Sequence, residues 1–141
     1  MSYDLAVFDP RPELRDPKKF YPWYDERTEW GEELDYNSPA NLTPALGRWF
    51  EEMAKSFPPM NGPLAYQGDD EDIQSAQADY SLGRDIIYVA FSWSKADDAY
   101  EACRKLAEKH GVGFLDASGE GAAWFPDGSG KLQVVHKAGD E

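Results

Sequence analysis

Two strand-length segments of this chain are apolar on both faces, and they constrain the fold more than any other feature. Residues 3–8 read YDLAVF and residues 86–93 read IIYVAFSW. A strand with one face in water alternates apolar and polar side chains, whereas a nearly continuous apolar run marks a central strand that helices cover on at least one side. We therefore expect both segments at the centre of one sheet.

Helical periodicity and turn residues place the other elements. Asp16 and Pro17 resemble a helix start, but Pro22 interrupts that segment, so we expect the regular first helix only from Pro22 onward. A second helix starts at Thr43, and a third ends before Gly111. The expected helices lie at residues 22–34, 44–57 and 95–110, and the expected strands at 3–8, 79–82, 86–93, 113–117, 122–125 and 132–135.

When the two early helices are counted as one crossover, the order of elements is βαββαβ, the split βαβ or ferredoxin-like plan. In that plan the first and third strands are central, and these are the two most apolar strands. We predict one α+β domain over residues 1–141, with a ferredoxin-like antiparallel sheet, helices on one face and an extra C-terminal β-hairpin. Residues 60–78 lack periodicity and are expected to form a mobile acidic loop.

Residues 21–36, YPWYDERTEWGEELDY, interleave aromatic and acidic side chains. On a helical wheel the two kinds separate onto opposite faces. The apolar face holds Phe20, Trp23, Tyr24, Trp30 and Leu34, and the other face holds Asp25, Glu26, Glu29, Glu32 and Glu33. The aromatic residues are therefore expected in the core. Arg27 lies within the apolar stripe, so it either extends outward to water or meets a carboxylate at the boundary between helix and sheet.

The chain carries a formal net charge of −13, from 27 acidic and 14 basic residues. This charge repels nucleic acid phosphates and anionic lipids, so we expect neither kind of partner and, if a macromolecule binds, a cationic one. The simpler interpretation is that the charge only keeps the protein soluble. The start MSYDLAVFDP lacks a basic segment followed by an apolar one, and apolar runs are short, so a cytoplasmic location is expected.

Candidate reactive groups are few. Cys103 is the only cysteine and lies in an apolar helical stripe, so it is expected in the core and not as a nucleophile. His110 closes the third helix, near the negative end of the helix dipole, and His136 is expected to be exposed. Asp79, Asp85 and Asp116 stand near strand ends, where a pair of carboxylates would suit acid–base chemistry.

Carboxylate groups at Glu26, Glu29 and Glu33 could hold Ca²⁺ or Mg²⁺, but one helix seldom supplies enough ligands. The acidic run Asp69, Asp70, Glu71 and Asp72 lacks the spacing and central glycine of an EF-hand loop. We therefore expect both clusters to be solvated, with no metal and no cofactor.

Several segments together resemble a group of small, largely uncharacterised bacterial proteins. They are YDLAVFDP (3–10), YDERTEW (24–30), FPPMNGP (57–63), DYSLGRDIIYVAFSWS (79–94), KHGVGFLD (109–116) and WFP (124–126). The resemblance spans most of the chain and brings no catalytic motif. Small acidic proteins of this kind are similar in type to the immunity proteins of bacterial toxin systems, which implies a protein partner.

The sequence thus favours a non-enzymatic interaction protein, most concretely an immunity-type protein that occludes a basic toxin. Acidic side chains would steer the encounter, and exposed aromatic residues would anchor it. The expected partner-binding residues are Glu26, Glu29, Glu33, Asp69, Asp70, Glu71, Asp72 and Trp124, with Tyr36 or Tyr66 as further anchors. One alternative is a domain that binds a small molecule or divalent cation between the sheet and the long loop; the last is an enzyme with a carboxylate site. The oligomeric state is left open.

Overall fold

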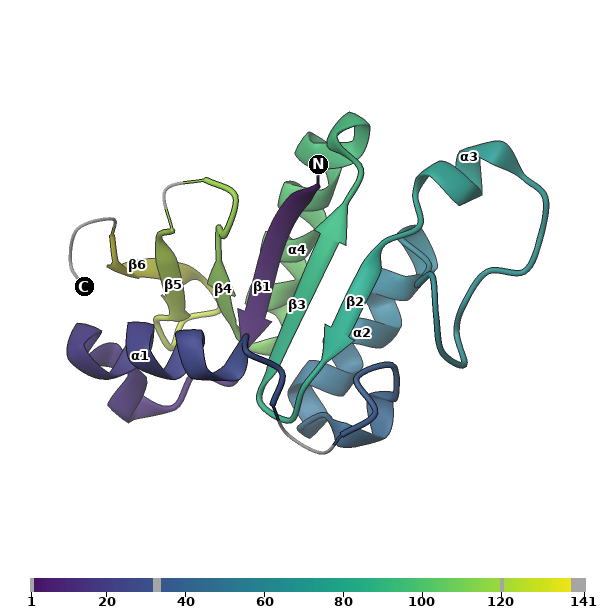
Figure 1. Cartoon of the computed structure of the whole chain (residues 1–141). Coiled ribbons are helices and arrows are strands. Elements are labelled where there is room, and N and C mark those ends of the chain that lie inside the picture. The colour runs from purple at the N-terminus through teal and green to yellow at the C-terminus, as the bar shows by residue number, and fades with distance from the viewer. Residues whose placement is uncertain (1, 32–33, 120, 138–141) are drawn as a thin grey trace.

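The computed structural model describes residues 2–31, 34–119 and 121–137 (Figure 1). It shows a mixed α+β fold, as predicted, built on a six-stranded sheet in which every pair of neighbouring strands is antiparallel. The elements are β1 (Tyr3–Phe8), α1 (Pro17–Arg27), α2 (Pro44–Ser56), α3 (Glu71–Ser75), β2 (Asp79–Leu82), β3 (Ile86–Phe91), α4 (Ala96–His110), β4 (Gly113–Leu115), β5 (Ala123–Pro126) and β6 (Leu132–His136).

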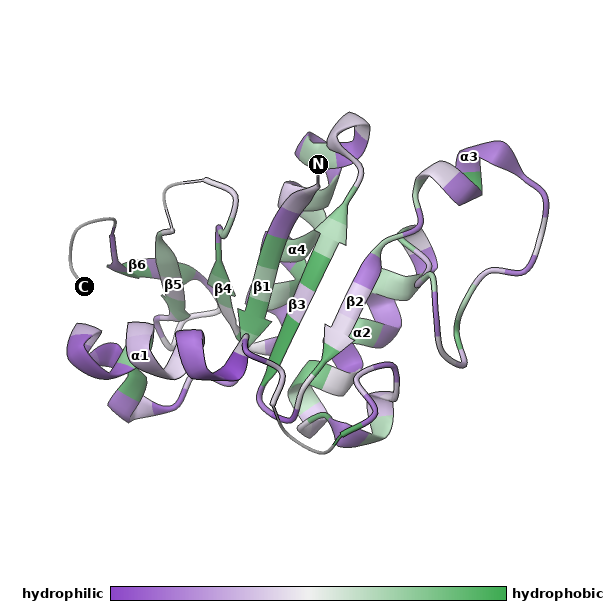
Figure 2. Cartoon of the chain, in the orientation of Figure 1, coloured by the Kyte–Doolittle hydropathy of each residue, from purple (hydrophilic) through white to green (hydrophobic). Residues whose placement is uncertain are grey.

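The strand order is β2-β3-β1-β4-β5-β6, so β1 and β3 lie side by side inside the sheet, as their apolar sequences predicted. Side chains alternate between the two faces along β1. Leu5 and Val7 enter the core on one face, and Ala6 and Phe8 enter the core on the other. Figure 2 shows the same concentration of apolar residues on β1 and β3.

Helices cover both faces of this sheet. The core on one face joins Leu5 and Val7 to the buried side chains of α2 and α4. The core on the opposite face joins Ala6 and Phe8 to Phe20 of α1. The expectation that all helices lie on one face is therefore wrong, because β1 is apolar on both sides and its second side is covered by the aromatic residues of α1 (Figure 1).

The first helix begins earlier and ends earlier than predicted. It covers Pro17–Arg27, not residues 22–34, and the Asp16 side chain caps it by accepting a hydrogen bond from Lys18 N at 3.0 Å. Pro22 lies inside the helix, where its missing N–H removes a single backbone hydrogen bond. Trp30 has a positive φ of 54°, which is incompatible with a continuing right-handed helix. Residues 32 and 33 lie outside the described ranges.

The other two long helices follow the sequence prediction closely. The buried stripe of α2 is Leu46, Trp49, Phe50 and Met53. α4 ends at His110 and is followed by Gly111, whose φ of 68° is the left-handed value that glycine adopts readily. α4 starts at Ala96, one residue later than predicted, and the residue before it, Lys95, makes no side-chain capping hydrogen bond. None of the helices in the described ranges is long and apolar enough to cross a bilayer.

The acidic segment between α2 and β2 contains a short helix, α3, which the sequence did not predict. Asp70 caps this helix, because its Oδ1 accepts hydrogen bonds from Asp72 N at 2.9 Å and Ile73 N at 3.3 Å. The tyrosine hydroxyl of Tyr66 accepts a further bond from Asp70 N at 3.2 Å. Asp70, one residue of the acidic run, therefore has a structural role as the cap of α3. The mobility of residues 60–78 stays a prediction.

Candidate interaction surface

One end of the sheet gathers carboxylates from segments that are far apart in the sequence. β1 and β2 begin at this end, and β3 and β4 finish there. Asp79 begins β2, Asp116 directly follows β4, and Asp97 and Asp98 lie in the first turn of α4. We call these four residues the acidic end. Asp79, Asp97 and Asp98 are exposed to solvent.

Two large apolar side chains are exposed beside these carboxylates. Trp93, which follows β3, is 50% exposed, and Met60 is 52% exposed. Met60 N donates a hydrogen bond to Ala78 O at 3.0 Å, which holds it next to the start of β2. A hollow of about 470 Å³ lies beside Met60, and its lining includes Asp79 and Ser92, the residue before Trp93. An exposed aromatic residue beside a hollow is typical of a binding surface.

Trp93 is supported from behind by Tyr3. The two ring centroids are 5.1 Å apart, and the ring planes are inclined at 58°. Tyr3 lies partly in the core beneath α4, so the pair joins the surface to the fold. The sequence reasoning assigned Trp93 to the end of a buried strand; the serines that flank it, Ser92 and Ser94, were the signal that the strand ends there.

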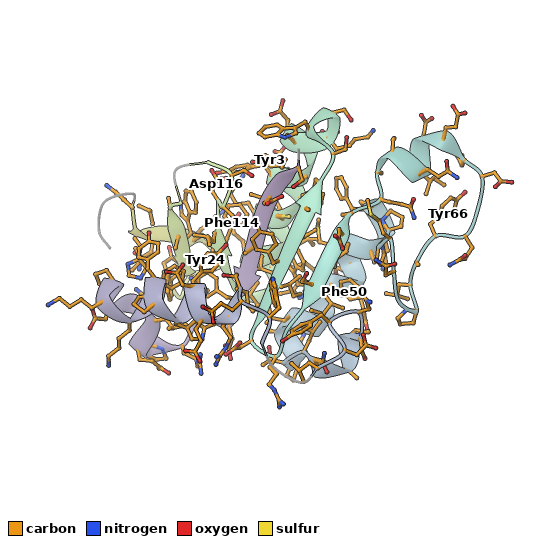
Figure 3. All side chains as sticks on the ribbon, viewed as in Figure 1. Tyr3, Tyr24, Phe50, Tyr66, Phe114 and Asp116 are labelled. Atoms are coloured by element: carbon orange, nitrogen blue, oxygen red, sulfur yellow. The ribbon has the colours of Figure 1, made fainter. Side chains whose placement is uncertain are left out.

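Two carboxylates of the acidic end act electrostatically on Tyr3. Burial raises the pKa of Tyr3 to about 12, and the charges of Asp116 and Asp97 add to the effect. Burial and the charge of Asp116 also raise the pKa of Tyr100, on α4. Figure 3 shows Tyr3 and Asp116 at the same end of the sheet. Burial disfavours a charge of either sign, whereas the negative charges of Asp116 and Asp97 disfavour a phenolate and favour a cation.

Asp4, near the same end, has a structural role. Its carboxylate accepts hydrogen bonds from the hydroxyl groups of Tyr88 and Ser2. The backbone N–H of Asp4 donates to Ser118 Oγ at 2.7 Å, which ties the β4–β5 connection to β1. Burial, followed by the charge of Asp4, raises the pKa of Tyr24 to about 12.

The predicted acidic face of the first helix is only partly formed. Glu26 and Glu29 are exposed, but α1 ends at Arg27, so Glu29 does not continue the helical face. Glu33 lies outside the described residues. Arg27 reaches the sheet, where its Nε lies 3.0 Å from Asp85 Oδ1, and its Nη1 also lies 3.9 Å from Glu26 Oε1. The second interpretation of Arg27, that it meets a carboxylate at the boundary, is therefore confirmed.

The acidic run at residues 69–72 is exposed to solvent. Asp69 precedes the cap residue Asp70, and Glu71 and Asp72 occupy the first turn of α3. Gln74 and Ser75, on the next turn, line the same hollow as Met60 and Asp79. The lining of that hollow thus includes the end of α3 but not the predicted partner-binding residues 69–72.

The predicted aromatic anchors are engaged in packing. Trp124 is partly buried and lies against Phe114, with ring centroids 5.4 Å apart. Tyr36 packs edge-on against Trp30 at 5.2 Å. Tyr66 is partly buried beside α3. Trp93 is more exposed than each of these three residues.

The three strand-end carboxylates do not form a catalytic pair. Asp79 and Asp116 share one end of the sheet, but β3 and β1 lie between their strands, a separation of about 14 Å at the usual strand spacing. Asp85 lies at the opposite end, held by two arginines. Among the described residues, no group of three or more His, Cys, Asp and Glu side chains is placed to hold a metal ion.

His136 is fully buried, so the prediction that it is exposed is wrong. Its Nε2 lies 2.7 Å from Leu14 O, and its ring stacks on Phe20 with centroids 4.8 Å apart. The reason is that β6 is a sheet strand whose inner face meets α1. His110, at the end of α4, lies 3.5 Å from Glu52 Oε1. Cys103 is in the core as predicted, and burial raises the pKa of its thiol.

A separate hollow of about 440 Å³ lies between α2 and the segment before α3. Its lining is mainly apolar and includes Pro39, Ala54, Pro63 and Leu64, with Glu51 and Lys55 at its margin. Comparison with known proteins adds no relative, because no family model, curated protein or solved structure matches the chain.

Proposed function

We propose that this protein is a non-enzymatic, cytoplasmic interaction protein of the immunity type, which binds a basic toxin or another basic protein and occludes it. The observation that carries the proposal is the acidic end, where exposed Trp93 and Met60 stand among carboxylates. Exposed aromatic residues supply much of the binding energy at protein interfaces, and surrounding charges set the association rate and the choice of partner.

The charge of the whole chain supports the same partner. A net charge of −13 attracts a basic protein from a distance, and charge steering of this kind raises association rates at low salt. The acidic run at the start of α3 adds further negative charge. A basic partner would meet the exposed side chains of Trp93 and Met60 together with nearby carboxylates.

The test uses a basic protein encoded next to this chain's gene, with association followed by stopped-flow fluorescence at several salt concentrations. The variant is Asp97→Lys/Asp98→Lys, and the matched control is Glu26→Lys/Glu29→Lys, which makes the same charge change on the α1 side. We expect association to slow as salt rises, and to slow more in the Asp97/Asp98 variant than in the control. If affinity and association rate are the same in all three proteins, the acidic end is not the docking surface.

A second candidate function is favoured by the apolar hollow between α2 and Leu64, whose size suits a small molecule. A ligand in this hollow would raise the melting temperature in a metabolite screen, and Ala54→Trp, which fills the hollow, would abolish that rise. An enzyme with a carboxylate site ranks last, because Asp4 and Asp85 are both used in structural hydrogen bonds.

For the architecture, we assign β1, α2, β2, β3, α4 and β4 to a ferredoxin-like unit. The order β2-β3-β1-β4 supports this assignment. The helix α1 and the β5–β6 hairpin are then additions to that unit.

A further inference from the structure

The protein contains an internal example of how it binds an arginine side chain. Two guanidinium groups lie over the ring of Trp23 in α1, with Arg11 Cζ 5.7 Å and Arg27 Cζ 5.8 Å from the ring centroid. Both arginines also bond to Asp85, Arg11 through Nη2 at 3.0 Å and Arg27 through Nε at 3.0 Å. One indole ring and one carboxylate thus hold a guanidinium by a cation–π contact and a charged hydrogen bond.

The acidic end presents the same two kinds of group with the arginine missing. A hollow of about 430 Å³ is lined by Trp93, Asp97 and Asp98, together with Ser94 and Ala96. In the part of the chain that the structure describes, arginines lie over Trp23 and Phe125, and no cation lies over Trp93. Trp93 is half exposed, so a partner can reach it.

We propose that Trp93 is the anchor for an arginine side chain of the partner protein, with Asp97 and Asp98 as its carboxylate acceptors. This inference rests on the proposed function and names the partner side chain that the surface selects. Arginine fits better than lysine because its planar guanidinium stacks on an indole and bonds to carboxylates at the same time. An ammonium group is more strongly hydrated and lacks the flat face.

The local field supports a cation at this position. The carboxylates Asp116 and Asp97 act on Tyr3, which lies directly behind Trp93. The start of α4 contributes the opposite sign, about half of one positive charge from the helix dipole. Lys95, the N-cap residue of α4, adds one positive charge, and Asp97 and Asp98 supply two full negative charges in the first turn of the helix.

The experiment compares fluorescein-labelled nona-arginine and nona-lysine peptides by fluorescence anisotropy. The proteins are the wild type, Trp93→Ala, Trp93→Phe, Asp97→Asn/Asp98→Asn and the charge-matched control Glu26→Gln/Glu29→Gln. Thermal melts check that each variant is folded, which is expected because Trp93 and the four carboxylates are exposed or half-exposed. The informative quantity is the ratio of the two peptide affinities, because general charge attraction acts on both peptides.

We expect the wild type to prefer nona-arginine by about 2–5-fold, the size of an exposed cation–π contact. Trp93→Ala should bring the ratio to about one while nona-lysine binding is retained, and Trp93→Phe should keep part of the preference. The Asp97/Asp98 variant should bind both peptides more weakly than the Glu26/Glu29 control. If Trp93→Ala leaves the ratio unchanged, the arginine anchor is refuted while a charge-based docking surface survives. If the wild type binds neither peptide at low salt, the anchor and the proposed function both fall.

Discussion

The buried carboxylate of Asp85 offers the sharpest test of how the α1 region is held to the sheet. Asp85 is 8% exposed and accepts charged hydrogen bonds from Arg11 and Arg27, which come from different segments of the chain. Breaking a fully buried ion pair costs about 3–5 kcal/mol, and an exposed pair contributes about 0–1 kcal/mol. The side chains of Arg11 and Arg27 are 36% and 26% exposed, so water compensates part of the loss. Asp85→Asn, which keeps the shape and removes the charge, should therefore lower the free energy of unfolding by about 2–3 kcal/mol.

The assay is urea unfolding followed by circular dichroism, with an unchanged m-value as the sign that the unfolding reaction is the same. The thermal midpoint should fall by roughly 6–12 °C. Asp79→Asn, the same substitution at an exposed site, is the control and should change stability by at most about 0.5 kcal/mol. A double-mutant cycle with Arg11→Gln should give a coupling of about 1 kcal/mol or more. If Asp85→Asn matches the control, or the cycle shows no coupling, the ion pairs do not hold α1 in place.

Three further predictions test the burial of His136, the pKa of Tyr24 and the packing around two glycines. His136→Ala should lower the free energy of unfolding by about 2–4 kcal/mol in urea, since it leaves a cavity and an unpaired carbonyl at Leu14; a cost under 1 kcal/mol would contradict the buried position. Folding raises the pKa of Tyr24 from 10.0 to about 12, so the neutral phenol contributes fully to stability below pH 10 and this contribution is lost as the pH rises through 12. Tyr24→Phe should therefore lose less stability than the wild type between pH 10 and 12. Urea unfolding at each pH measures the difference. Gly47→Ala in α2 should stabilise the protein by about 0.5–1 kcal/mol, because a Cβ at this position meets no atom within 4 Å. Gly113→Ala should destabilise it by about 1–3 kcal/mol, because a Cβ there would lie 2.3 Å from the ring of Phe8 in β1. Equal melting temperatures for the two variants would argue against this packing.

The elements that sequence reasoning predicted well are those in which local signals and tertiary packing agree. β1 and β3 are apolar on both faces, and the fold buries both faces. α2 begins at Pro44 and carries a regular apolar stripe, and α4 ends at a glycine in the left-handed conformation. In these elements the local sequence signal agrees with the burial that the fold provides, so the strand or helix could be predicted without knowing which element packs against it.

The α1 region and His136 could not be predicted because tertiary contacts outweigh local signals there. A wheel drawn through Trp30 assumes a continuous helix, but the helix ends at Arg27 and Trp30 reaches the core with a positive φ. Pro22 is accommodated inside the helix, although the local rule placed it at the helix start. For His136, position near the end of the sequence suggested exposure, and only the addition of β6 to the sheet reveals its burial beneath Phe20.

The candidate surface illustrates a different limit. Carboxylates that are adjacent in sequence, such as those at residues 69–72, are easy to see, yet one of them serves to cap α3. The acidic end takes Asp79, Asp97 and Asp116 from three separate elements, and only the antiparallel strand order brings those elements to the same end of the sheet. The same strand order places Asp85 at the opposite end, where two arginines already bind it. Asp85 and Trp23 already bind arginines of the same chain, and these contacts stabilise the fold. Trp93, with the nearby carboxylates of Asp97 and Asp98, remains accessible to an arginine from a partner.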